Sequence, residues 1–280
     1  MKTFFKDFQG YRAYKKLPKN FKNIVFYSES FQDWHHLKPL LNGLLNQKIA
    51  VTYVTSDEKD PGLLKQSTGY RSVYIGKGFF RILFFQYLEA KLFFLTMLDL
   101  NNFELKRSIN PVHYVYLFHT LGSTHMVDHD NSYDHYDTIL CAGPHQKKEI
   151  QLRENNKGLI RKNLVSYGYP RLEKLIQLNV LPNNDRKVIL LAPTWGENSI
   201  INLIGMEICS IIIDQGYSLI LRPHHETLKR SPDLIDEIEK KFSNHESFKL
   251  VKEMGDSESL LQSDLLICDW SGTAIEYALG

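Results

Sequence analysis

The chain has 280 residues, of which 43% are hydrophobic and 24% charged, and its formal net charge is +2. These values are ordinary for a soluble globular protein with a large core, and the length favours two domains. The small net charge argues against a nucleic-acid binder, which usually carries a strong basic excess. Residues 1–7 contain no sustained apolar run, so no signal peptide is visible.

In the first 180 residues, short apolar segments alternate with segments of helical spacing. Strands are expected at 23–27, 49–55, 72–75, 112–118, 137–142 and 164–167, and helices at 33–46, 79–89, 144–155 and 171–179. Residues 91–98 fit either a strand or a helix. The alternation predicts parallel sheets covered by helices on both faces.

Residues 181–185 are dense in turn formers and read as a linker. They predict a first Rossmann-like domain over residues 1–182 and a second over residues 183–280, facing each other across a cleft. In the second, strands are expected at 187–192, 218–222, 248–251 and 264–268, and helices at 200–215, 234–242, 257–262 and 273–279. A seven-residue helix is a poor end for such a sheet, so we expect the second domain to be incomplete at its C-terminus.

One segment, residues 78–98, is rich in Phe and Leu. Arg81, Glu89 and Lys91 interrupt it, so a membrane-spanning helix is not expected. The favoured interpretation is a buried helix followed by a buried strand. The alternative is that its Phe and Leu side chains, flanked by Lys77, Arg81 and Lys91, meet a membrane surface.

In open α/β sheets, ligands bind beyond the carboxyl ends of the strands. The first polar strand end is His119, which enters a loop containing Gly122, Ser123 and Thr124, and Gly122 is a candidate substrate contact. A histidine in this position can act as a general base near neutral pH. The alternative is a histidine that hydrogen-bonds to a neighbouring loop.

Three more polar strand ends belong to the second domain. Thr194 and Gly196 follow one strand, and both could approach a phosphate. The alternative is a rigid turn that serves only to pack Trp195 on the edge of the domain. Arg222 and His224 follow another strand and are donors suited to a phosphate or pyrophosphate.

The last strand end is the loop over residues 269–273. A strand that feeds a helix through a small polar loop forms an anion site from free backbone N–H groups and the helix dipole. Its candidate donor-binding residues are Asp269, Ser271, Gly272 and Thr273. The alternative is an ordinary crossover with Ser271 as a helix N-cap.

Metal and disulfide chemistry are not expected. Cys141, Cys209 and Cys268 stand singly in apolar segments, which fits a reducing cytoplasm. Six of the eleven histidines lie between His113 and His145, with four aspartates among them, but no metal-ligand motif is present. A solvated polar connection is the better interpretation, and no cofactor is predicted.

Five short motifs occur in a characteristic order. They are His119 after an apolar strand, Gly-Tyr-Pro-Arg at 168–171, Ala-Pro-Thr-Trp at 192–195, Arg-x-His at 222–224, and Ser-Asp at 263–264 followed by Asp269-x-Ser271. Together they resemble the CDP-glycerol glycerophosphotransferase family, the teichoic-acid-type polymerases and primases. The resemblance covers roughly residues 110–280.

This resemblance implies a GT-B fold and an enzyme that transfers glycerol phosphate, or a related polyol phosphate, from a CDP-activated donor to an acceptor hydroxyl, releasing CMP. It implies His119 as the base, Arg222 and His224 as pyrophosphate contacts that act in catalysis, and Asp269 and Ser271 as donor contacts. The implied acceptor is a polyol phosphate or lipid-linked glycan. The implied location is the cytoplasm, with peripheral contact to the inner face of a bacterial membrane.

Two departures from the family pattern affect the substrate more than the fold. The usual Trp-His-Gly reads Phe118-His-Thr-Leu-Gly122, and the usual Arg-x-His-Pro reads Arg-Pro-His-His at 222–225. Two alternatives stay open: a GT-B glycosyltransferase or epimerase that uses a UDP-sugar, and a GT-B scaffold without catalysis.

Overall fold

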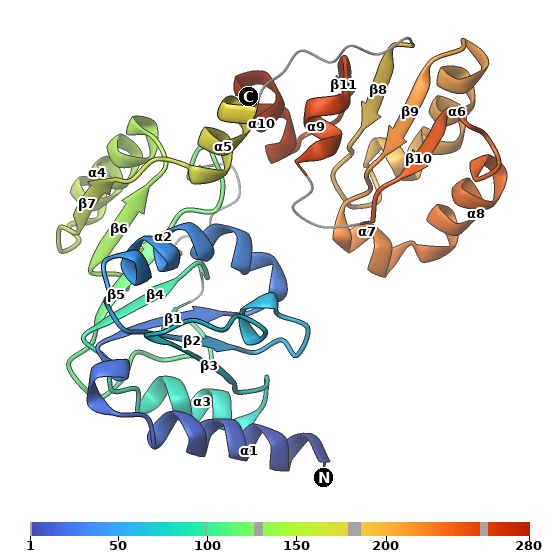
Figure 1. The fold of residues 1–280 in the computed structure, drawn as a ribbon. Helices are drawn as coiled ribbons and strands as arrows, with labels where there is room; N and C mark the ends of the chain where they lie inside the picture. Colours follow the sequence, from blue (N-terminus) through green and yellow to red (C-terminus); the bar gives the residue numbers. More distant parts are fainter. Residues whose placement is uncertain (1, 99, 126–130, 179–185, 253–256) are drawn as a thin grey trace. The chain divides into compact units, whose positions relative to one another are not determined.

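The computed structural model describes residues 2–98, 100–125, 131–178, 186–252 and 257–280. Its contacts divide the chain into two units, Met1–Pro170 and Arg171–Gly280 (Figure 1). The predicted linker at 181–185 lies outside the described residues. Helix α5 (Pro170–Leu178) falls almost entirely in the second unit, where its Leu175 is buried in the core.

The first unit contains a seven-stranded sheet in the order β3-β2-β1-β4-β5-β6-β7, and every neighbouring pair is parallel. The strands are β1 (Ile24–Ser28), β2 (Val51–Thr55), β3 (Tyr70–Tyr74), β4 (Leu92–Leu95), β5 (His113–Leu117), β6 (Thr138–Cys141) and β7 (Asn163–Ser166). Each expected strand is confirmed within about two residues at its ends, and residues 91–98 supply a strand. The parallel arrangement predicted from the alternation is therefore correct.

Helices cover both faces of this sheet (Figure 1). Helix α2 (Trp34–Asn46) buries Trp34, Leu37 and Leu41 against one face. Helices α1 (Lys2–Lys15) and α3 (Phe79–Gln86) cover the other, and α4 (Pro144–Lys157) follows β6. Short 3₁₀ turns η1 (Lys19–Lys22), η2 (Phe31–Asp33) and η3 (Pro61–Leu63) complete the described elements of the unit.

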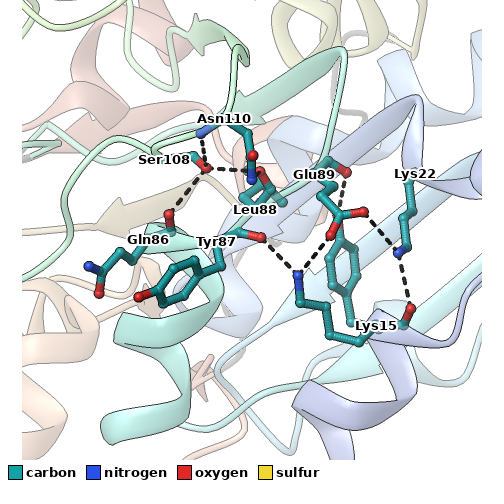
Figure 2. A network of polar contacts seen from close by, with 9 residues as sticks. Lys15, Lys22, Gln86, Tyr87, Leu88, Glu89, Ser108 and Asn110 are labelled. Atoms are coloured by element: carbon teal, nitrogen blue, oxygen red, sulfur yellow. Dashed lines mark hydrogen bonds and ion pairs between the residues drawn. The ribbon is translucent and has the colours of Figure 1, made fainter.

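The apolar segment 78–98 forms the buried helix α3 and the buried strand β4, as favoured. Phe84, Phe85 and Phe93 are fully enclosed in the core. The charged residue Glu89 lies at the turn between the two elements and forms ion pairs with Lys15 and Lys22, at 2.9 and 3.3 Å (Figure 2). The described helices include none with both the length and the apolar character that a membrane crossing requires.

Helix α1 is not among the elements expected from the sequence. It packs along α3 and the end of β3, with ring contacts from Phe4 and Phe8 to Phe80. Gly10 makes this approach possible, because a Cβ there would lie 1.7 Å from the carbonyl oxygen of Tyr74. The helix is therefore placed by a backbone contact between distant segments.

The second unit contains a four-stranded parallel sheet in the order β10-β9-β8-β11. Its strands are β8 (Val188–Leu191), β9 (Ser218–Leu221), β10 (Phe248–Leu250) and β11 (Leu265–Ile267). Helices α6 (Ile200–Asp214) and α8 (Pro232–Phe242) bury Cys209 and Ile235 in one core cluster. Helices α5, α9 (Glu258–Gln262) and α10 (Gly272–Leu279) contribute Leu175, Leu260 and Tyr277 to another. One element, α7 (His225–Arg230), is not expected from the sequence.

Candidate functional site

Each sheet has one point where the strand order reverses. In the first sheet it lies between β1 and β4, and in the second between β8 and β11. At such a point the connections on either side lead away in opposite directions and leave a crevice at the carboxyl ends of the strands. The predicted site residues His119, Thr194 and Asp269 follow β5, β8 and β11, so they stand at or beside these two crevices.

In the second unit, Asp269 joins the two strands at the reversal point. One carboxylate oxygen accepts a hydrogen bond from the backbone N–H of Thr194, and the other accepts one from the N–H of Ile200 at 2.9 Å. Asp269 therefore holds the turn after β8 and the first residue of α6. This is a loop-shaping role that the sequence did not indicate, and it leaves lone pairs on both oxygens for a ligand hydroxyl.

The loop 269–273 continues into α10 with the expected anion-site geometry. Ser271 is the N-cap, and its hydroxyl accepts a hydrogen bond from the N–H of Thr273 at 3.2 Å. Gly272 is the first helical residue. The first N–H groups of a helix have no partner within the helix, and the dipole favours an anion there. Ser271 thus fits both interpretations: it caps the helix, and the helix it caps can bind a phosphate.

Arg222 reaches the same loop from the end of β9. Its guanidinium donates to the Thr273 hydroxyl and to the Ser259 hydroxyl, each at 3.1 Å. The structure therefore brings Arg222 together with the loop 269–273, two strand ends that are about 50 residues apart in sequence. A guanidinium fixed on two hydroxyls is oriented before a phosphate arrives, which lowers the entropy lost on binding.

His224 is the N-cap of α7, and its Nδ1 accepts a hydrogen bond from the N–H of Glu226 at 3.2 Å. Burial, with a smaller contribution from the charge of His225, lowers the pKa of His224 to about 4. At neutral pH the ring is uncharged, and because Nδ1 is the acceptor, the proton lies on Nε2. His224 is therefore a neutral donor suited to a phosphate oxygen.

Trp195 lies beside His224, with ring centroids 6.3 Å apart, and the Arg230 guanidinium lies 4.9 Å from the Trp195 ring. The turn after β8 thus packs against the helix that follows β9. Thr194 is half-buried, and its backbone N–H is used by Asp269. Trp195 makes these ring contacts while it remains 44% exposed, so it packs only in part.

In the first unit, His119 lines a cavity of about 590 Å³ at the β1–β4 reversal point. Burial lowers the pKa of His119, while the negative charge of Asp33 opposes that shift. The ring therefore stays neutral at pH 7, as a general base requires. Its Nδ1 lies 3.4 Å from the Tyr116 hydroxyl, and its carbonyl accepts from the Tyr169 hydroxyl at 3.3 Å.

The loop after His119 is fastened to α4. The carbonyl oxygen of Gly122 accepts a hydrogen bond from the Gln146 side chain at 3.1 Å, and the N–H of Gly122 donates to the Thr120 hydroxyl. Thr124 donates from both its N–H and its hydroxyl to Glu149. Gly122, predicted as a substrate contact, thus lies in a loop of fixed shape beside His119.

Several polar residues of this cavity were not predicted as site residues from the sequence, among them Asp33, Arg81 and Thr96. Asp33 follows β1, and its carboxylate accepts from the N–H groups of Glu29 and Ser30 and from the Thr96 hydroxyl, at 2.8, 3.2 and 2.9 Å. Arg81 projects from α3, and Thr96 follows β4. The sequence offered little signal for them, because Asp33 only begins the helix expected at 33–46 and Thr96 lies within residues 91–98, which fit either a strand or a helix.

Across the described ranges, no three His, Cys, Asp or Glu side chains are arranged to hold a metal ion. The Nε2 atom of His113 hydrogen-bonds with the Thr138 hydroxyl, and the Nε2 atom of His145 hydrogen-bonds with the Leu121 carbonyl oxygen. Asp128, His129 and Asp130, which belong to the histidine-rich stretch, lie outside the described residues.

Two Rossmann-like units with parallel sheets define the GT-B architecture of nucleotide-dependent transferases and epimerases. The family model for CDP-glycerol:poly(glycerophosphate) glycerophosphotransferases matches residues 14–280, and the chain belongs to this family. The match extends well beyond the 110–280 region carried by the motifs. No protein of curated function matches the chain in sequence.

Solved structures support the fold. A structure of the wall teichoic acid polymerase TagF with CDPG has a TM-score of 0.57 at 16% identity, covering 97% of this chain and 71% of that one. A UDP-GlcNAc 2-epimerase from Methanocaldococcus jannaschii has a TM-score of 0.57 at 13% identity, covering 92% and 81%. A putative UDP-N-acetylglucosamine 2-epimerase from Listeria monocytogenes has a TM-score of 0.60 at 11% identity, covering 91% and 76%. At these identities the likeness concerns the fold alone.

Proposed function

We propose that this chain transfers glycerol phosphate, or a related polyol phosphate, from CDP-glycerol to an acceptor hydroxyl in cell-envelope polymer synthesis, with release of CMP. The observation that carries the proposal is the family match over residues 14–280. The TagF structure with CDPG supports a donor of this type. The acceptor in this proposal is a polyol phosphate or a lipid-linked glycan.

The proposed donor site is the second unit. The pyrophosphate is bound by Arg222, by Nε2–H of His224 and by the first turn of α10, and Asp269 and Ser271 shape the loop around it. These groups are donors or fixed dipoles, and they stabilise the charge that moves onto the phosphate oxygens in the transition state.

The proposed base is His119 of the first unit. It takes the proton from the acceptor hydroxyl while that oxygen forms a bond to the β-phosphorus of the donor. The bond from this phosphorus to the bridging oxygen breaks, and CMP leaves with the bonding electron pair. A neutral imidazole accepts one proton in this step, which fits the lowered pKa of His119.

Binding of CDP-glycerol against UDP-GlcNAc, measured by calorimetry, tests the donor class. We expect CDP-glycerol to bind at least tenfold more tightly, and Arg222→Gln to weaken it. Tighter binding of UDP-GlcNAc would favour the epimerase or glycosyltransferase alternative, to which the epimerase structures are similar in fold. If CDP-glycerol binds but is not turned over with any acceptor tested, the alternative of a GT-B scaffold without catalysis would be favoured.

We also propose peripheral contact with the inner face of the membrane through α1 and α3. Phe4, Phe8 and Phe79 surround Phe80, with ring centroids 5.0, 5.3 and 5.5 Å away, and are 60%, 39% and 57% exposed. Lys77 is exposed beside them. Exposed aromatic rings with nearby cations are suited to an anionic lipid surface.

Co-sedimentation with phosphatidylglycerol vesicles tests this contact. The double variant Phe4→Ser, Phe79→Ser should lower the bound fraction severalfold. Ile160→Ser, which removes an exposed apolar side chain elsewhere, should not. Equal binding of all three proteins would contradict the proposed surface.

A further inference from the structure

Tyr116 places a fixed hydroxyl beside the ring of His119. Its side chain is fully buried on β5, and its ring meets the rings of Phe118, Tyr133 and Tyr136 with centroids 5.0, 5.1 and 5.2 Å away. A ring packed in this way keeps one orientation, so the position of its hydroxyl is fixed as well. That hydroxyl lies 3.4 Å from Nδ1 of His119. Buried tyrosine hydroxyls normally have a hydrogen-bond partner of this kind.

Other groups hold His119 from further sides. Its backbone carbonyl accepts a hydrogen bond from the Tyr169 hydroxyl at 3.3 Å. The ring of His36, on α2, approaches edge-on at 5.8 Å between centroids, and the Asp33 carboxylate of η2 acts on the His119 ring through its negative charge. These contacts fix which nitrogen faces Tyr116. Nδ1 is engaged there, and Nε2, which has no hydrogen-bond partner among the described residues, is the nitrogen left for a ligand in the cavity.

The tautomer of His119 decides what this arrangement can do. A neutral imidazole carries one proton, and the nitrogen without it is the basic one. With the proton on Nδ1, that N–H donates to the Tyr116 oxygen, and Nε2 offers its lone pair to an acceptor hydroxyl. With the proton on Nε2, the Tyr116 hydroxyl donates to Nδ1, and Nε2 can only donate. His119 is therefore a base toward the cavity in the first tautomer alone.

Proton transfer strengthens the contact in that first tautomer. When Nε2 takes a proton, the ring becomes positively charged, and the bond from Nδ1–H to the Tyr116 oxygen becomes charge-assisted. Such bonds are about twice as strong as neutral ones. The Tyr116 oxygen therefore stabilises the protonated ring more than the neutral ring, which makes Nε2 a stronger base.

We propose that Tyr116 is a positioning residue: its oxygen holds the proton of His119 on Nδ1 and thereby keeps Nε2 as the basic nitrogen of the site. This inference rests on the proposed function, in which His119 takes the proton of the acceptor hydroxyl. It assigns that step to one nitrogen of the ring and names the group that selects it.

Nitrogen-15 NMR of the full chain, labelled at histidine, reads the tautomer without any substrate, because protonated and unprotonated ring nitrogens differ widely in chemical shift. The His119 signals are those lost in His119→Gln. At a pH where the ring is neutral, we expect a protonated Nδ1 and an unprotonated Nε2 in the wild type. Tyr116→Phe keeps the ring and removes the oxygen. It should move much of the population to the Nε2–H tautomer, which neutral histidine prefers in water.

The same variant should lower kcat for CMP release about tenfold or more, as for the loss of one charge-assisted hydrogen bond, and leave KM for CDP-glycerol unchanged. Tyr114→Phe is the matched control. Tyr114 stands two residues earlier on the same strand, is equally buried, and its hydroxyl accepts a hydrogen bond from the N–H of Ser108 at 2.7 Å. Its loss should change neither the His119 tautomer nor kcat.

A proton on Nε2 in the wild type would overturn the proposal, as would an unchanged tautomer in Tyr116→Phe. Full kcat in a Tyr116→Phe protein whose tautomer has moved would also contradict it. If Tyr116→Phe does not fold, the wild-type chain is made with ring-fluorinated tyrosine, whose more acidic hydroxyl is a weaker acceptor. The Nδ1–H signal should then shift, and an unshifted signal decides against the proposal.

Failure of the proposed function looks different. If the tautomer and its response to Tyr116→Phe are as expected but no CMP is ever released from CDP-glycerol, the transferase proposal fails. The assignment of the His119 proton to Nδ1 by Tyr116 then stands.

Discussion

Arg222 donates to the hydroxyl of Thr273 at 3.1 Å and thereby links the end of β9 to the first turn of α10. Thr273 stands where the helix dipole favours an anion, so the link places a guanidinium beside an anion site. A second bond, to Ser259, fixes the same side chain from α9. Three segments of the second unit are thus arranged around one cation.

Replacing this cation by a shorter donor tests the arrangement. Arg222→Lys keeps the charge but cannot reach both hydroxyls in the same geometry. We expect it to weaken CDP-glycerol binding about tenfold to a hundredfold, as for loss of a charge-assisted hydrogen bond of about 1.5–3 kcal/mol. Ser259→Ala, which removes only the supporting bond, should weaken binding less. Equal effects of the two changes on the measured Kd would contradict a direct contact.

His119 should be essential for turnover. His119→Ala should lower kcat by between about a hundredfold and ten-thousandfold, the usual contribution of a general base. His113→Ala is a matched control, because His113 starts the same strand that His119 follows. Release of CMP is the measurement. Full activity of the His119 variant would exclude it as the base.

The pH profile follows from the direction of the His119 shift. Burial lowers the pKa of His119 from 6.5, so the ring is unprotonated at pH 7. We expect kcat/KM to reach a plateau on the alkaline side and to fall in acid as His119 becomes protonated, with a midpoint under 6.5. Asp33→Asn removes the charge that opposes the shift and should move this midpoint further down. A midpoint above 7 would contradict the assignment.

His224 should make folding pH-dependent. Its pKa is about 4 in the folded protein against 6.5 unfolded, so between these values the unfolded state binds more protons. Stability should therefore be complete above pH 6.5 and decrease as the pH falls toward 4. Thermal unfolding at pH 7 and pH 5 should give a smaller difference for His224→Gln than for the wild type. An equal difference in both proteins would show that other groups cause the pH dependence.

The ion pair between Arg171 and Glu276 should be structural. It joins α5 to α10 at 2.9 Å, with side chains only 15% and 11% exposed. Arg171→Met leaves the buried Glu276 carboxylate without its cation and should lower the free energy of unfolding by about 3 kcal/mol. The double variant Arg171→Met, Glu276→Leu should recover much of that loss. Urea unfolding of both variants measures this. If the double variant is as unstable as the single one, the pair is not what stabilises this contact.

Most elements could be predicted from the sequence, because apolar runs and helical spacing fix where strands and helices occur. Helix α1 was missed because its position depends on Gly10 meeting the backbone at Tyr74, a contact with no local signal. Helix α7 could not be predicted because it is only six residues long, and because its N-cap is a histidine, His224, which is not among the usual N-cap residues.

The site was predictable in part for a similar reason. His119, Arg222 and the loop 269–273 follow predicted strands, so their place at the carboxyl ends could be inferred. Arg81 could not, because it lies in the first turn of an apolar helix and reaches the cavity only through the packing of α3 on the sheet. Nor could the sequence show that Asp269 binds the backbone at Thr194 and Ile200.

The central claim is transfer of polyol phosphate from a CDP-activated donor. Incubation of the chain with CDP-glycerol labelled in the glycerol, together with a glycerophosphate-terminated acceptor, tests it most directly. The account predicts CMP as the nucleotide product and label in the acceptor, both lost in His119→Ala. Release of CDP in place of CMP, or turnover of UDP-GlcNAc with none of CDP-glycerol, would contradict it.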